Sequence, residues 1–174
     1  MIIDVSKIEE STLPFESAAE PEVLELDVAN YRLTSPAVAS GEITLHIGSI
    51  SVAGSIKGET EADCTRCLRP IQKPLAIDFD VDYLTDGELG SDDDLQLQPG
   101  DLDRDELRDY RLDLNQLVRE QILLNIPEQI YCTEDCKGLC EKCGGNLNLV
   151  NCNCEDDEID PRWEALKNLK DSLN

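Results

Sequence analysis

The stretch Leu75–Leu84 (LAIDFDVDYL) alternates between apolar and polar side chains and decides the class of fold. A period of two is typical of a β-strand that has one face in a core and the other in water. The apolar face would consist of Ile77, Phe79, Val81 and Tyr83, and the acidic face of Asp78, Asp80 and Asp82. The sequence therefore predicts a half-buried strand here.

Upstream segments carry the same alternation. Val23–Asp27 (VLELD) alternates apolar and acidic residues, and Glu42–Val52 (EITLHIGSISV) is expected to turn its isoleucine and leucine side chains to one side. Glycines punctuate this region and indicate turns or bulges. Several strands at short spacing favour an antiparallel sheet or a small open barrel.

Downstream, the spacing of apolar residues changes to three or four. Leu112–Pro127 (LDLNQLVREQILLNIP) predicts a helix over 113–126, with Asp113 as N-cap and Pro127 where the helix should stop. A last helix is expected to begin at Asp160, because Pro161 suits a first helical turn.

Charge excludes two classes of function. The 174 residues include 38 Asp and Glu but 15 Lys and Arg, for a net charge of −23. Such a chain cannot coat a phosphate backbone through a broad basic surface, and it is unsuited to an anionic membrane face.

Many of the acidic residues fall in 85–105, which we interpret as a solvated acidic loop. A calcium loop is a weaker interpretation, because the carboxylates do not follow the EF-hand order.

Eight cysteines are the second anomaly of composition. The N-terminal MIIDVSKIEEST lacks the features of a secretory signal, and no apolar run approaches the roughly 18 residues of a membrane span. We therefore expect a cytoplasmic protein. Clustered cysteines in a reducing compartment are more often metal ligands or catalytic thiols than disulfides.

The cysteines fall into two groups along the chain. Cys-x2-Cys pairs suit tetrahedral zinc, because one tight turn aims both sulfurs at one ion, and glycines after the second cysteine of such a pair ease the turn. The candidate ligands are Cys64 and Cys67 in the first group, and Cys132, Cys136, Cys140, Cys143, Cys152 and Cys154 in the second.

Spacing alone leaves the pairing open. One division joins Cys64 and Cys67 to Cys132 and Cys136, and leaves a local site of four further along. Another holds a single zinc within the second group. Iron–sulfur ligation, or reduced structural or redox thiols, are further alternatives. One or two structural zinc ions are the cofactors that we expect.

Signs of catalysis are missing from the sequence. His46 is the single histidine and lies on a predicted strand, no nucleophile motif accompanies it, and neither a P-loop nor a dinucleotide fingerprint occurs. We therefore expect a protein that is not an enzyme.

Three segments resemble the YceD family, the large ribosomal RNA subunit accumulation proteins. CTRCLRP (Cys64–Pro70) is similar to the family's central motif, and DLNQLVREQILLNIP (Asp113–Pro127) to its helix. CTEDCKGLCEKCGGNLN (Cys132–Asn148), with Cys152-Asn-Cys154 and DPRWEAL (160–166), is similar to the cysteine-rich tail of many members. Asn125-Ile126 departs from the alanine-leucine pair that is common there.

The resemblance implies a role in accumulation of large-subunit ribosomal RNA and in ribosome assembly, in the cytoplasm or, for a plastid relative, in the plastid stroma. Two hypotheses fit. The chain binds a basic large-subunit ribosomal protein or a pre-ribosomal particle through charge complementarity, or it contacts precursor RNA through a local basic spot formed by Arg66, Arg69 and Lys73. No membrane and no small-molecule substrate are expected.

The predicted fold is α+β: an antiparallel sheet or small open barrel with one or two packed helices and a C-terminal zinc-knuckle segment. We place a strand-rich domain at 1–127, with the acidic loop 85–105 and the helix 113–126. A cysteine-rich, zinc-binding tail with the terminal helix follows at 128–174.

Overall fold

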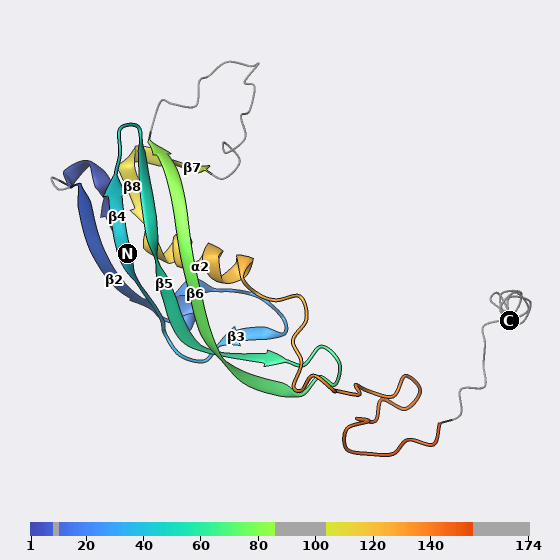
Figure 1. Cartoon of the computed structure of the whole chain (residues 1–174). Helices are drawn as coiled ribbons and strands as arrows, with labels where there is room; N and C mark the ends of the chain where they lie inside the picture. The colour runs from blue at the N-terminus through green and yellow to red at the C-terminus, as the bar shows by residue number, and fades with distance from the viewer. Residues whose placement is uncertain (9–10, 86–103, 155–174) are drawn as a thin grey trace, which may run out of the picture.

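The computed structural model describes residues 1–8, 11–85 and 104–154 (Figure 1). Most of the predicted acidic loop 85–105, and the helix expected from Asp160, lie outside the described residues. None of the helices in the described part has the length and hydropathy needed to cross a membrane.

One open, mostly antiparallel sheet forms the body of the chain. Its strand order is β2-β4-β5-β6-β7; β3 pairs with the distal part of β5, and only the β6–β7 pairing is parallel. A separate two-stranded sheet joins β1 to β8. The strands are β1 (Ile2–Asp4), β2 (Thr12–Ala19), β3 (Tyr31–Leu33), β4 (Ala37–Leu45), β5 (Ser49–Asp63), β6 (Pro70–Thr85), β7 (Arg104–Leu107) and β8 (Arg111–Asp113). The predicted α+β class is confirmed.

The prediction for Leu75–Leu84 is also confirmed. β6 buries Ile77, Phe79 and Tyr83, with Val81 partly buried beside them, and it exposes the three aspartates between them. The other long strands likewise bury one face, as an antiparallel sheet with one wet side should.

The predicted helix is α2 (Leu114–Leu124), and it covers the buried face of the sheet (Figure 1). Asp113 is its N-cap, because its carboxylate accepts a hydrogen bond of 2.9 Å from the Asn115 N–H. The apolar stripe of α2 packs into the same core as the strands; it consists of Leu114, Leu117, Val118 and Ile122. Two short 3-10 helices, η1 (Val5–Lys7) and η3 (Arg108–Tyr110), complete the described elements with the short helix α1 (Pro21–Leu24).

The strand predicted at Val23–Asp27 is wrong. Pro21–Leu24 forms the short helix α1, with Pro21 at its start, and Glu25 and Asp27 then adopt positive φ angles of 42° and 48°. Pro21 has its φ already set for a first helical turn. Of the apolar residues only Leu24 and Leu26 are buried, whereas Val23 is 55% exposed, so the alternation does not reflect a sheet.

Glu42–Val52 is two strands and not one. The chain turns at 46–48 between β4 and β5, where Gly48 has a φ of 80°. Ile47 lies in the turn and is fully exposed, while Ile43 and Ile50 on either side are buried. The alternation of apolar and polar residues in the sequence runs through the hairpin turn, although the chain reverses its direction there. The pattern alone therefore does not reveal the turn.

Candidate metal centre

The eight cysteines gather into two groups of four, and either group can hold a metal ion. We call Cys64, Cys67, Cys132 and Cys136 the inner site, and Cys140, Cys143, Cys152 and Cys154 the outer site. Within each group, all four sulfurs lie within 4.8 Å of one another. All eight cysteines are free thiols.

The inner site has the dimensions of a tetrahedral metal centre. A metal–sulfur bond of about 2.3 Å implies a separation of about 3.8 Å between two sulfurs of a tetrahedron. The Sγ atoms of Cys64 and Cys136 are 3.8 Å apart, and those of Cys67 and Cys132 are 3.7 Å apart. Three of the four cysteines are buried, so the ion would be shielded from water.

The outer site is similar but more open. The Cys152 Sγ lies 3.5 Å from that of Cys143 and 3.3 Å from that of Cys140, somewhat closer than the ideal edge. Cys143 and Cys154 are exposed, and Cys140 and Cys152 are partly exposed. The two sites therefore share a ligand set but differ in access to solvent.

Each site contains one Cys-x2-Cys turn, and the two turns have the same hydrogen bonds. In the first, the Cys64 N–H donates to the Arg69 carbonyl at 2.9 Å and the Leu68 N–H donates to the Cys64 carbonyl at 2.9 Å. In the second, Cys140 and Gly145 form the matching contact, and the Gly144 N–H donates to the Cys140 carbonyl, both at 2.8 Å. The sequence offers a glycine in one turn and a leucine in the other, yet both adopt one geometry.

The backbone of each turn stabilises a thiolate. Burial raises the pKa of Cys64, but N–H groups of Cys67, Arg66 and Cys132 outweigh burial and lower it to about 6. The N–H of Cys143, helped by the Cys152 thiol and the Lys142 N–H, lowers the pKa of Cys140 to about 6. A thiolate is the form that binds metal, so each turn holds one sulfur in the form that binds a cation.

The inner site joins the tail to the sheet. Cys64 and Cys67 lie in the turn between β5 and β6, and Cys132 and Cys136 come from the segment after α2 (Figure 1). The Thr65 N–H donates to the Ile130 carbonyl at 2.8 Å, next to this junction. The four ligands therefore come from two parts of the chain that α2 and three strands separate in sequence.

Arg66 reinforces the same junction. Its guanidinium donates to the Cys136 carbonyl at 3.0 Å and to the Glu134 carbonyl at 3.4 Å, and it lies over the Tyr131 ring at 4.2 Å. Such stacking is favourable for a guanidinium. Arg66 thus serves the attachment of the tail, a role that its sequence neighbourhood did not reveal.

The other basic residues of the predicted spot lie apart from this contact. Arg69 and Lys73 are exposed, Arg69 in the β5–β6 turn and Lys73 on β6. His46 is exposed at the β4–β5 turn and belongs to neither cysteine site.

Residues 52–170 match the family described as "Large ribosomal RNA subunit accumulation protein YceD". The chain belongs to the YceD family. The family takes its name from accumulation of the large ribosomal RNA subunit, and both cysteine sites lie within the matched residues. The resemblance seen in the cysteine motifs and the helix is confirmed.

Curated relatives extend from bacteria to chloroplasts. The chloroplastic YCED homolog 1 of Arabidopsis thaliana, named as a large ribosomal RNA subunit accumulation protein, is 25% identical over 84% of the chain and 52% of its own length. YlbN of Bacillus subtilis is 26% identical over 97% of the chain and 94% of its own length. Rv2926c of Mycobacterium tuberculosis is 28% identical over 72% of the chain and 59% of its own length. The chain thus spans about half the length of the plant relative, and no solved structure matches it.

A supporting residue that sequence reasoning missed is Asn148. Its amide donates to the Cys136 Sγ at 3.4 Å, and its Oδ1 accepts from the Lys137 N–H at 2.8 Å. Asn148 lies between the cysteines of the outer site in sequence but contacts the inner site. The signal available was an asparagine in a short loop rich in cysteine, which is too common to single out one residue.

Proposed function

We propose that the chain is a non-enzymatic factor that supports accumulation of large-subunit ribosomal RNA by binding a basic large-subunit ribosomal protein. The observation that carries this proposal is the distribution of charge. A net charge of −23 gives the whole molecule a negative field. The exposed face of β6 presents Asp78, Asp80 and Asp82 in a row.

Charge complementarity explains how such a surface would act. A negative face attracts a basic protein, speeds the encounter and repels competing polyanions such as RNA. An early-assembling ribosomal protein would thereby be kept from unproductive contacts until it is delivered. Membership of the family supplies the cellular context.

Direct contact with precursor RNA through Arg66, Arg69 and Lys73 has less support. Arg66 is engaged with the carbonyls and the aromatic ring of the tail. The two remaining cations are few for a phosphate-binding surface in so acidic a chain.

We also propose that the inner and outer sites each hold one structural zinc ion. Four thiolates at tetrahedral spacing are the ligand set of structural zinc, whereas catalytic zinc usually has three protein ligands and a water molecule. Elemental analysis of protein purified without added metal should give two zinc per chain. A visible charge-transfer spectrum from iron, or clearly fewer than two zinc ions per chain, would contradict this.

The partner proposal is tested by capture from cell lysate. The zinc-loaded chain is immobilised at low salt, and retained proteins and RNA are identified after a salt gradient. We expect a basic large-subunit protein that elutes with a steep dependence on salt. Replacing Asp78, Asp80 and Asp82 with Asn should shift elution to lower salt, whereas Glu22→Gln, at an exposed position on α1, should have a smaller effect. Recovery of ribosomal RNA alone would overturn the proposal.

A further inference from the structure

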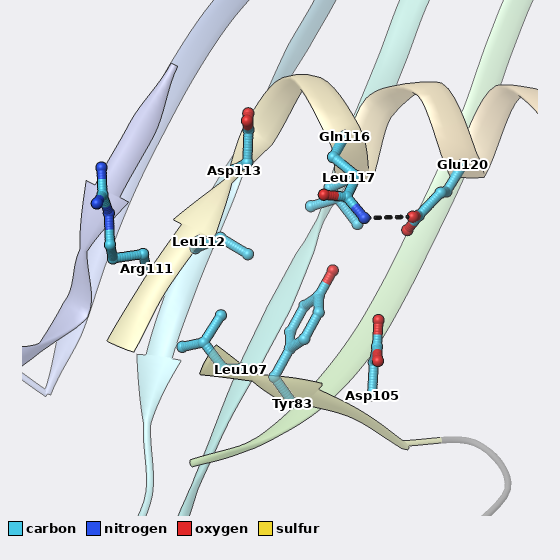
Figure 2. Close-up of a pocket in the computed structure, with 9 residues that line it drawn as sticks. All are labelled: Tyr83, Asp105, Leu107, Arg111, Leu112, Asp113, Gln116, Leu117 and Glu120. Atoms are coloured by element: carbon cyan, nitrogen blue, oxygen red, sulfur yellow. Dashed lines mark hydrogen bonds between the residues drawn. The ribbon is translucent and has the colours of Figure 1, made fainter. Parts of the chain in front are cut away.

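A cavity of about 420 Å³ lies beside the C-terminal end of β6, and none of the eight cysteines lines it. Figure 2 shows its lining residues. It is formed where β6 and β7 approach β8 and α2. Tyr83 projects into it, Leu107 and Leu117 provide apolar walls, and Asp105 and Glu120 provide carboxylates. Asp105 and Gln116 are exposed, so the cavity communicates with solvent. Its volume falls within the usual range for ligand pockets.

The Tyr83 hydroxyl is the feature that points to a ligand. The side chain is 6% exposed, and its hydroxyl points into the space below Leu117 (Figure 2). Within the described part of the chain, that hydroxyl makes no hydrogen bond, although Gln116 and Glu120 beside it bond to each other at 2.8 Å. No fully buried side-chain polar atom in the described part of the chain lacks a partner, so this hydroxyl is reached from the cavity and is free to bond a group that enters it.

The electrostatics of the cavity favour a cation. Burial, and then the negative charges of Glu120 and Asp105, raise the pKa of Tyr83, so the phenol stays neutral and can accept a hydrogen bond. Arg111 is the one basic residue that lines the cavity among the described side chains. It is exposed and lies on the far side of Leu112 from Tyr83 (Figure 2). Two carboxylates therefore act on the space around the hydroxyl.

We propose that this cavity receives a lysine or arginine side chain of a basic protein partner. The inference rests on the proposed function and names the place on the chain where that partner is anchored. The apolar walls suit the methylene stem of such a side chain. The Tyr83 ring and hydroxyl suit its cationic head. Glu120 can accept a charge-assisted hydrogen bond from that head, and the negative charge of Asp105 adds to the attraction.

Small probes test the chemistry without any partner. N-acetyl-lysine methylamide, N-acetyl-arginine methylamide and the neutral N-acetyl-norleucine methylamide are titrated into the full zinc-loaded chain, and the methyl signals of Leu107 and Leu117 are followed by NMR. Both cationic probes should shift these signals saturably, and the neutral probe should not. Equal shifts with all three would overturn the inference. Spermidine that binds more than about tenfold tighter than the lysine probe would also overturn it, because the site would then belong to a free polyamine.

Matched variants locate the contact. Glu120→Gln should weaken binding of the arginine probe by about tenfold, and Tyr83→Phe should weaken it less, because a charged partner contributes more than a neutral one. Glu128→Gln, at an exposed position outside the cavity, should leave affinity unchanged. Unchanged affinity in both cavity variants would overturn the inference.

The two proposals fail separately. If a basic ribosomal protein is captured but Glu120→Gln and Tyr83→Phe bind it as the unaltered chain does, the cavity inference falls and the proposed function stands. If the cationic probes bind with the expected pattern but no basic ribosomal protein is captured, the preference of the cavity for a basic side chain stands and the proposed partner falls.

Discussion

Leu68 and Gly144 occupy equivalent positions in two Cys-x2-Cys turns that have the same backbone hydrogen bonds. Each follows the second cysteine of a Cys-x2-Cys pair, each donates its N–H to the carbonyl of the first cysteine, and each has a positive φ, 57° for Leu68 and 68° for Gly144. Glycine adopts this conformation without strain, whereas a side chain resists it. Leu68 is 61% exposed, so little burial offsets the strain.

Substitutions at these two positions should change the free energy of unfolding in opposite directions. Leu68→Gly should raise the free energy of unfolding by up to about 1 kcal/mol, since relief of strain exceeds the added freedom of the unfolded chain. Gly144→Ala should lower it by about 1 kcal/mol through backbone strain alone, because a Cβ there meets nothing within 4 Å. Urea unfolding of the zinc-loaded chain measures both. Two changes of the same sign would contradict the shared geometry.

The two cysteine sites should release metal at different rates. A chromogenic chelator should remove one zinc per chain at least about tenfold faster than the second, because exposed sites open locally at a small cost in free energy. The outer site, with Cys143 and Cys154 exposed, should account for the fast phase. Cys143→Ser should abolish that phase and leave the slow one intact. A single phase of two zinc ions would show that burial does not separate the sites.

Arg66 should contribute more to stability than Arg69 does. Arg66→Met removes the hydrogen bonds to the Cys136 and Glu134 carbonyls and the contact with Tyr131. We expect a loss of about 1 kcal/mol, with the exposure of Arg66 keeping the figure low. Faster proteolytic cleavage within 128–136 should accompany the loss. Arg69→Met is the control and should change neither quantity; equal effects from both variants would point to net charge as the cause.

Tyr83 should make the fold sensitive to alkali. Burial, with Glu120 and Asp105, raises the pKa of Tyr83 in the folded chain, so the unfolded chain releases this proton at lower pH. Its contribution to stability is therefore complete below the ordinary tyrosine pKa of about 10 and is lost as the pH rises above it. Denaturant unfolding between pH 9 and 11 should show a steeper decline for the unaltered chain than for Tyr83→Phe. Parallel declines would mean that the phenol ionises equally easily in both states.

Local patterns predicted the parts of the fold that depend on local chemistry. The alternation in β6 and the cap and stripe of α2 are read from adjacent residues, because period and capping act within a few positions. Val23–Asp27 shows the limit of such patterns: five residues can alternate by chance, and Pro21, two residues before them, favours a helical turn.

The arrangement of the cysteines needed the three-dimensional fold. Sequence showed that Cys64 and Cys67 could share a site with Cys132 and Cys136, but spacing along the chain carries no information on which turn the tail reaches. The turn that the tail reaches depends on the length of the β5–β6 hairpin and on where α2 ends. The unpartnered Tyr83 hydroxyl was equally hidden, because alternation assigned Tyr83 to the core without showing a cavity beside it.

The inner site also links metal binding to the order in which the chain is synthesised. Cys64 and Cys136 are 72 residues apart, and Cys67 and Cys132 are 65 apart, so a metal ion bound between them closes one long loop that contains β6, β7, β8 and α2. A nascent chain holds half of this ligand set until the tail has left the ribosome. A metal ion that binds all four cysteines would therefore do so late, after residue 136 has emerged, and it would remove from the unfolded ensemble the freedom of that whole loop.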